Sequence, residues 1–252
     1  MFEEISLIPA FKDNYIWLLR RDRQAFVVDP GDAAPVRARL AAEGLRLAGI
    51  LITHHHADHQ GGVAALLAEH DCPVYAPAEE SITGRTHSLR GGERLDVLGV
   101  PVEVLAVPGH TLGHLAYLAA DALFCGDTLF GAGCGRLFEG TPAQMQAALA
   151  RIAALPETTR IYCAHEYTLM NLPFAAAVEP GNPAISERTR RAAELRQAGQ
   201  ATVPLTLAEE KSTNPFLRWA QPAVIAAALA HGAADDSPAA VFGALRAWRN
   251  TF

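Results

Sequence analysis

The stretch that decides the fold is Leu47-Ala48-Gly49-Ile50-Leu51-Ile52-Thr53-His54-His55-His56-Ala57-Asp58-His59. Its first seven residues form a continuous apolar run of strand length, which is typical of a strand buried on both faces in the middle of a sheet. The run leads directly into four histidines and an aspartate. A cluster of this kind at the end of a buried strand predicts a metal site.

The order of the residues in this cluster indicates how they would be used. Residues two apart in an extended chain point the same way, so His54 and His56 are expected to grip one ion while His55 points elsewhere. Asp58 and His59 follow where the chain turns into a helix, and are expected to project toward a neighbouring position. One short loop would thus serve two adjacent metal sites.

Two metal sites need more ligands than this loop supplies, and three further His or Asp positions follow predicted strands. In open sheets, ligands gather where strands end and loops converge. A closed structural zinc site is the weaker interpretation because such sites favour cysteine ligands. The predicted ligands are His54, His56 and His110 for one ion and Asp58, His59 and His165 for the other, with Asp127 bridging them.

On both sides of the cluster, short apolar runs alternate with turn signals. A hairpin is expected over residues 14–20 and 25–28, and a helix with Thr141 as N-cap over residues 142–154. Beyond residue 172 the texture becomes helical, with Ser237 placed to cap the last helix. The other expected strands are 47–53, 74–76, 102–107, 115–118, 122–125 and 161–163, and the other expected helices are 34–42, 62–69, 184–198, 222–230 and 238–249.

Composition limits the classes of function. The 252 residues carry 21 Lys and Arg against 27 Asp and Glu, and no basic run stands out, which argues against nucleic acid as a partner. The four cysteines form no Cys-x-x-Cys pair and are expected to be free thiols in a reducing cytoplasm. The acidic N-terminus and the lack of a long apolar stretch favour a cytoplasmic protein that does not enter membranes.

The metal-ligand motifs resemble those of a known superfamily. Residues 53–59, Gly109-His110-Thr111, Gly126-Asp127-Thr128 and His165 are similar to the metallo-β-lactamase superfamily. The resemblance implies an α/β fold, an αββα sandwich with two metals at one edge of its sheets. It covers residues 1–172, the expected catalytic domain, and leaves residues 173–252 as an all-helical substrate-binding domain.

Further phrases resemble one branch, glyoxalase II or hydroxyacylglutathione hydrolase, over nearly the whole length. The resemblance implies a thioester hydrolase that cleaves S-(2-hydroxyacyl)glutathione, chiefly S-D-lactoylglutathione, to glutathione and D-lactate, the second step of methylglyoxal detoxification. The phrases are Gly126-Asp127-Thr128-Leu129-Phe130, residues 133–140, His165-Glu166-Tyr167-Thr168, Asn214-Pro215-Phe216-Leu217-Arg218 and Arg246-Ala247-Trp248-Arg249.

The resemblance also implies which residues hold the substrate. Arg136, Tyr167, Arg246 and Arg249 match the family's substrate contacts, and the arginines would meet the two carboxylates of glutathione. Arg136 stands where the family commonly has Lys, which keeps the charge. Phe138 stands where a Tyr is often found, which removes a hydroxyl donor from that contact.

The expected chemistry uses two divalent metal ions per chain. Zinc is the first choice, and a His/Asp ligand set suits iron and manganese as well. A metal-bound hydroxide held near Asp58 and Asp127 is the expected nucleophile, so no Ser, Cys or Thr nucleophile is needed. Asp29, after the run 25–28, is either an acceptor that orients a ligand or a turn residue ahead of Pro30-Gly31.

Three other functions remain open from the sequence. A persulfide dioxygenase of the same superfamily uses a related motif but one iron. A lactonase or β-lactamase is a second alternative, although Asp58 and the missing export signal disfavour a β-lactamase. A non-catalytic metal-binding module is the third. We expect a monomer that acts on a small-molecule glutathione thioester.

Overall fold

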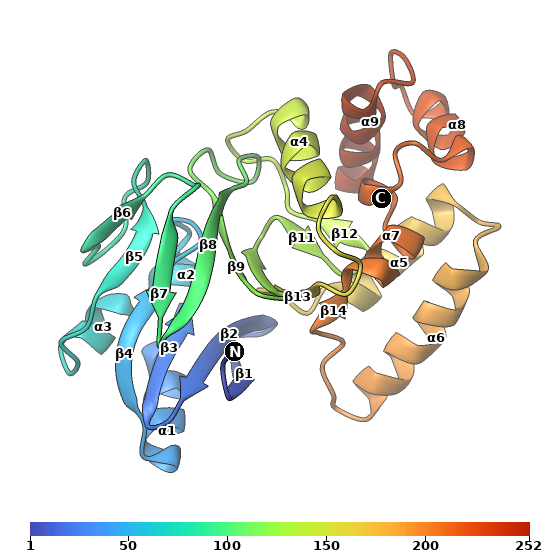
Figure 1. The fold of residues 1–252 in the computed structure, drawn as a ribbon. Coiled ribbons are helices and arrows are strands. Elements are labelled where there is room, and N and C mark those ends of the chain that lie inside the picture. The colour runs from blue at the N-terminus through green and yellow to red at the C-terminus, as the bar shows by residue number, and fades with distance from the viewer. The chain divides into compact units, whose positions relative to one another are not determined.

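The computed structural model describes residues 1–252 and divides into two compact units (Figure 1). Unit 1 comprises Met1–Ala106 and Thr111–Gly126, and unit 2 comprises Val107–His110 and Asp127–Phe252. This division differs from the predicted boundary after residue 172, which falls inside helix α5 (Thr168–Val178). The assignment of separate catalytic and substrate-binding domains stays a prediction.

Unit 1 contains a six-stranded sheet in which the strands lie in chain order. The first three strands pair antiparallel and the following three parallel. The predicted strand 47–53 is observed as β4 over residues 46–51, and it lies inside the sheet as predicted, between β3 and β5, with Ile50 and Leu51 fully buried. The predicted hairpin is β2–β3. The strands are β1 (Glu4–Ala10), β2 (Asn14–Arg21), β3 (Gln24–Val28), β4 (Arg46–Leu51), β5 (Val74–Pro77) and β6 (His87–Leu89).

Unit 1 also contains three helices, which lie between the strands of this sheet in the sequence. Helix α1 (Ala33–Glu43) begins at Asp32, whose carboxylate accepts a hydrogen bond from the Ala34 amide, and α2 (Ala57–Gln60) carries the end of the histidine cluster. Helix α3 (Val63–Leu67) is shorter than the predicted helix over residues 62–69. Its Val63 and Leu66 join the buried apolar cluster of the sheet.

The rest of unit 1 is an antiparallel meander of β7 (Arg94–Val97), β8 (Val100–Ala106), β9 (Leu115–Ala119) and β10 (Ala122–Gly126). Buried and exposed residues alternate at the start of β8, the pattern of a strand with one face on the core. The predictions for β8, β9 and β10 are confirmed within two residues.

Unit 2 begins with short strands and one long helix. Strands β11 (Leu129–Phe130) and β12 (Gly133–Cys134) pair with each other, as do β13 (Arg160–Cys163) and β14 (Leu205–Thr206). Helix α4 (Pro142–Ala153) has the predicted N-cap. The Thr141 hydroxyl accepts from the Gln144 amide while the Gln144 side chain accepts from the Thr141 amide, a complete capping box.

Helices dominate the remainder of unit 2, as predicted. The cap at Ser237 is confirmed, and the two-residue strand β14 is the only extended element between the helices. None of the helices combines the length and the apolar character that crossing a bilayer requires. They are α5 (Thr168–Val178), α6 (Pro183–Gln197), α7 (Leu207–Thr213), the 3-10 turn η1 (Pro215–Leu217), α8 (Pro222–Ala230) and α9 (Pro238–Thr251).

Candidate functional site

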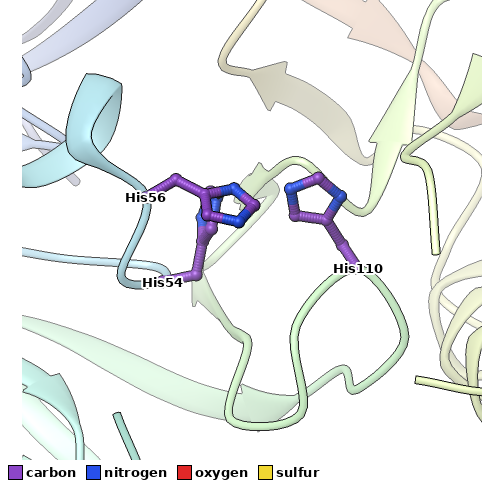
Figure 2. Close-up of side chains that lie close together, drawn as sticks. All are labelled: His54, His56 and His110. Carbon is purple, nitrogen blue, oxygen red and sulfur yellow. The ribbon is translucent and has the colours of Figure 1, made fainter. Parts of the chain in front are cut away.

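The histidine loop of unit 1, residues 53–59, begins two residues after the end of β4. Figure 2 shows His54 and His56 on this loop, and their ring atoms Nε2 and Nδ1 lie 3.0 Å apart. The two rings are nearly perpendicular, at 78°. The predicted convergence of His54 and His56 is therefore present, and it brings two nitrogen ligand atoms to one point.

Asp29 directly follows β3 and holds this loop through hydrogen bonds. Its buried carboxylate accepts hydrogen bonds from the Thr53 amide at 2.7 Å, the Thr53 hydroxyl at 2.7 Å and His59 Nδ1 at 2.9 Å. Asp29 also has a φ of 53° and its carbonyl accepts from the Gly31 amide, so it forms the turn as well. Asp29 therefore forms the turn and also accepts a hydrogen bond from His59, and its role in orienting a metal ligand stays a prediction.

These hydrogen bonds determine which ring nitrogens remain for a metal. The Thr53 hydroxyl donates to Asp29, so its oxygen accepts from His54 Nδ1, 3.0 Å away. His59 Nδ1 donates to Asp29 in the same way. Each ring then directs an Nε2 lone pair outward, which is the usual arrangement of a metal-binding histidine with an oriented outer nitrogen.

Asp58 lies beside His59 on helix α2. One of its oxygens is 3.6 Å from His59 Nε2, and the same oxygen accepts a hydrogen bond of 2.9 Å from Asn14 Nδ2 on β2. Asn14 thereby fixes the carboxylate against the imidazole. Unit 1 thus presents two pairs of candidate ligand atoms, one from His54 and His56 and one from Asp58 and His59.

Unit 2 carries the remaining three predicted ligands, and Asp127 links them. His110, labelled in Figure 2, has Nε2 3.4 Å from Asp127 Oδ2, and His165 has Nε2 3.3 Å from Asp127 Oδ1. Two ligand atoms on one tetrahedral zinc ion, each about 2.0–2.1 Å from it, lie about 3.3–3.4 Å apart. Each carboxylate oxygen therefore lies at ligand spacing from a different imidazole, which is what a bridging aspartate requires.

The outer faces of these two histidines are also fixed. His110 Nδ1 donates to the Arg136 carbonyl at 2.8 Å, which leaves Nε2 for a ligand. The His165 ring stacks on Tyr167, with 4.7 Å between centroids and 9° between planes. Tyr167 is one of the predicted substrate contacts, so this residue touches a candidate ligand directly.

A cavity of about 350 Å³ in unit 2 contains all five residues predicted to bind substrate. Its walls include the candidate ligands His110 and Asp127, which places cationic and aromatic side chains beside ligand atoms in one cavity. The lining residues are His110, Asp127, Phe130, Cys134, Gly135, Arg136, Phe138, Tyr167, Met170, Asn171, Arg246 and Arg249.

Three arginines make this cavity positive although the whole chain is acidic. Burial lowers the pKa of Arg249, and the nearby charges of Arg246 and Arg136 lower it further. Repulsion among three guanidinium groups is tolerated where an anion neutralises them. Asp127 is the one acidic residue in the lining, so the cavity favours a ligand with negative charge.

Arg246 is the most buried of the three. One of its terminal nitrogens donates to the Cys134 carbonyl at 3.0 Å and the other to Asn250 Oδ1 at 3.1 Å, while its buried Nε has no hydrogen-bond partner. The guanidinium also lies 5.3 Å from the Phe216 ring centroid. Arg246 therefore binds the Cys134 carbonyl through one terminal nitrogen and keeps the N–H of Nε without a partner.

The other predicted contacts differ in exposure. Phe138 is 62% exposed and places its ring 5.2 Å from His110, edge to face. Arg136 is exposed and lines the same cavity.

Cys134 also lines the cavity. It is buried, and burial raises the pKa of its thiol. None of the four cysteines forms a disulfide, as the sequence predicted, and all four are buried.

Two kinds of comparison with known proteins cover nearly the whole chain. Residues 11–165 match the model of the metallo-β-lactamase superfamily, and residues 166–252 match the model named hydroxyacylglutathione hydrolase C-terminus. The hydroxyacylglutathione hydrolase of Dechloromonas aromatica is 65% identical over 99% of both chains, and that of Alkalilimnicola ehrlichii 59% identical over 98% of both. The chain belongs to the hydroxyacylglutathione hydrolase family.

Solved structures place the family's fold in its wider superfamily. ETHE1 from Myxococcus xanthus has a TM-score of 0.65 and 26% identity, covering 84% of this chain and 83% of its own. The BLEG-1 B3 metallo-β-lactamase has a TM-score of 0.66 and 25% identity, covering 85% and 100%. The fold is the metallo-β-lactamase fold with a C-terminal helical domain, as predicted, and its His and Asp clusters indicate a dinuclear metal site.

In this member of the hydroxyacylglutathione hydrolase family, two buried residues near the candidate ligands were not predicted from the sequence. His114 is buried and stacks on His54 with 4.6 Å between ring centroids. Glu80 accepts hydrogen bonds from the Thr111 hydroxyl and the Gly113 amide, and burial raises its pKa. Glu80 lies in a polar stretch that resembles any surface loop, and its partners are more than 30 residues away, so no local signal identifies it.

Proposed function

We propose that this chain hydrolyses S-(2-hydroxyacyl)glutathione thioesters, with S-D-lactoylglutathione as the first substrate, to glutathione and a 2-hydroxy acid. The observation that carries the proposal is the cavity of unit 2, in which Arg246 and Arg249 share one space with His110 and Asp127. A substrate with carboxylates at one end and a thioester at the other matches this combination. The relatives named hydroxyacylglutathione hydrolase support it over nearly their full length.

Two divalent metal ions complete the proposed site. The ligands would be His54, His56 and His110 for one ion and Asp58, His59 and His165 for the other, with Asp127 shared. The donor set fits, because the ring nitrogens are oriented and Asp127 has ligand spacing to two imidazoles. Zinc is proposed first, with iron and manganese as alternatives. When bound, the ions lower the pKa of water and polarise the thioester carbonyl.

The protein groups around the ligands have separate tasks. Asp29 holds His59 and, through Thr53, His54 in one orientation. The Arg136 carbonyl does the same for His110. Asp58 and Asp127 are the proposed catalytic carboxylates, since they are the two carboxylates in the proposed ligand set. Fixed ligands of this kind present the substrate with an arrangement that needs little reorganisation.

The substrate would be held chiefly by charge. Arg136, Arg246 and Arg249 would pair with the two glutathione carboxylates, and Phe138 and Tyr167 would form aromatic walls. The leaving thiol resembles the cysteine side chain, whose pKa is about 8.5, so it departs as a thiolate without a dedicated acid.

A thioester assay combined with metal analysis on the same sample tests the proposal. We expect metal-replete protein to release glutathione from S-D-lactoylglutathione and to contain two metal ions per chain. Oxygen consumption with glutathione persulfide and a single iron would favour the dioxygenase alternative. Brisk cleavage of a lactone or β-lactam without thioester cleavage would contradict the proposal, and bound metal without turnover of any of these substrates would support a non-catalytic module.

Location and oligomeric state are proposed from the sequence. The four free cysteines fit a reducing compartment, so we propose that the protein acts in the cytoplasm. We also propose that the chain acts as a monomer. Size-exclusion chromatography with light scattering would measure the oligomeric state.

A further inference from the structure

The hairpin β11–β12 carries much of the substrate cavity on very little structure of its own. It pairs only Leu129 with Cys134 and Phe130 with Gly133. Phe130 and Cys134 line the cavity, and Arg136 follows immediately after. A two-stranded hairpin of this length is not stable alone in water. Its position must therefore be imposed by contacts from outside.

Side chains from the helices of unit 2 supply those contacts, residue by residue. Every backbone group that they bind lies between residues 130 and 134, so the helices satisfy the polar groups that a short hairpin leaves unpaired. Asn214 donates to the Phe130 carbonyl at 3.2 Å and the Gly133 carbonyl at 2.9 Å, Asn171 donates to the Gly131 carbonyl at 3.0 Å, Glu210 accepts from the Ala132 amide at 3.0 Å, and Arg246 donates to the Cys134 carbonyl at 3.0 Å.

The Glu210 carboxylate is fully buried and is neutralised inside unit 2. Its first oxygen pairs with the buried Arg188 of α6, and its second oxygen accepts from Asn214 at 2.9 Å as well as from Ala132. Thr213 accepts from Arg188 on the other side. A buried carboxylate with these partners has one orientation, because any other leaves a charge unpaired. The hairpin is thus attached to a rigid point.

The hairpin also fits its support closely. A β-carbon on Gly131 would overlap the Thr168 hydroxyl, and one on Gly133 would overlap the Asn171 amide, both on α5. Ala132 between them has a φ of 54°, a conformation that costs free energy for a residue with a β-carbon. The hydrogen bond to Glu210 holds the strained residue, so the turn is kept by the helices rather than by its own preference.

We propose that Asn214 and Glu210 are positioning residues for thioester binding. Neither lines the cavity. They act through the hairpin, which places Phe130, Cys134 and Arg136 around the substrate, and through the Arg136 carbonyl, which orients His110. This inference rests on the proposed function, because it assigns to the hairpin the task of holding a glutathione thioester.

Replacement of Asn214 by alanine tests the inference against a matched control. Asn214→Ala removes the amide that donates to the hairpin and to Glu210, whereas Ser212→Ala removes a neighbouring hydroxyl that donates to the Glu209 carbonyl and touches neither the hairpin nor Glu210. We expect Asn214→Ala to raise the KM for S-D-lactoylglutathione and the Kd for glutathione about fivefold or more, the factor that one net hydrogen bond supports. Ser212→Ala is expected to leave KM and Kd unchanged.

A second variant keeps the test usable if Asn214→Ala does not fold. Asn214→Ser retains one donor and is expected to give a smaller rise in KM and Kd. Both measurements are made well below the melting temperature of each variant. Lower thermal stability of the Asn214 variants with unchanged KM and Kd would overturn the positioning role. Wild-type protein that neither binds glutathione nor cleaves its thioesters would instead contradict the proposed function, so the two failures are distinguishable.

Discussion

The histidine loop of unit 1 and the hairpin β11–β12 of unit 2 both present functional groups, but they take their support from different distances in the chain. The histidine loop follows a central parallel strand, and its chief support, Asp29, ends the strand that pairs with it. The hairpin depends on Asn171, Glu210, Asn214 and Arg246, which lie 40 to 112 residues beyond their backbone partners.

This difference indicates how each of the two groups of functional residues is held in place. A loop at the end of a buried strand is held in position by the sheet, because the core fixes the strand and its neighbour. A hairpin with only two residue pairs has no comparable support of its own. Contacts from other elements must hold it in position. The C-terminal helices therefore contribute to the cavity twice, once by lining it and once by holding the hairpin that lines it.

The largest expected effect comes from the carboxylate that unit 2 presents to two histidines. Asp127→Ala should remove both metal ions, since each oxygen lies at ligand spacing from a different imidazole. kcat/KM should fall by more than about 100-fold, beyond the 10–100-fold typical of losing an outer partner. His110→Ala should chiefly weaken one ion. Metal content and turnover are measured together, with exposed Asp121→Ala as control, and equal loss of one ion in both variants would show that Asp127 is not a bridge.

The support of the unit 1 loop is tested at Asp29. Asp29→Asn keeps an oxygen for the Thr53 amide but replaces the oxygen that accepts from His59 and the Thr53 hydroxyl. Metal affinity should fall about 10–100-fold in a chelator competition. Asp32→Asn, in the same turn, should leave it unchanged because asparagine caps a helix as well as aspartate. Unchanged affinity in Asp29→Asn would mean that the loop has another support.

Cationic binding in unit 2 is tested at Arg249. Arg249→Ala should raise KM for S-D-lactoylglutathione about tenfold, because a charge-assisted contact contributes roughly 1.5–3 kcal/mol. The double variant with Arg246→Ala should lose more than tenfold in kcat/KM, although Arg246 also holds the Cys134 carbonyl. Metal content should be retained in Arg249→Ala. Exposed Arg190→Ala is the control, and an unchanged KM in Arg249→Ala would place the carboxylates elsewhere.

The smallest expected effect concerns stability in unit 1. Burial raises the pKa of Glu80 above 4.5, so the ionised carboxylate destabilises the folded state at neutral pH. Glu80→Gln should therefore raise the melting temperature at pH 7, and the advantage should vanish well below pH 4.5, where the carboxyl is protonated in both states. Exposed Glu79→Gln should show no such dependence. A lower melting temperature for Glu80→Gln at pH 7 would mean that the bonds to Thr111 and Gly113 outweigh the burial of charge.

Much of the fold could be predicted because its signals are local. The apolar run of β4, the capping box at Thr141 and the N-cap at Ser237 are all encoded within a few residues. Helix α5 was missed because Pro173 lies inside it, and proline ordinarily marks a helix boundary. The strands β11 and β12, two residues each, are too short to show any period.

The sequence by itself determined the candidate metal ligands, their spacing and the capped helices, because periodicity and side-chain chemistry depend on near neighbours. Only the tertiary structure decided that Asp29 orients two histidines, that Glu80 joins Thr111 and Gly113, and that Asn214 and Glu210 hold the hairpin. These contacts join residues far apart in the chain. Each buried polar group must find a partner wherever the packed core places one, and no local pattern records that choice.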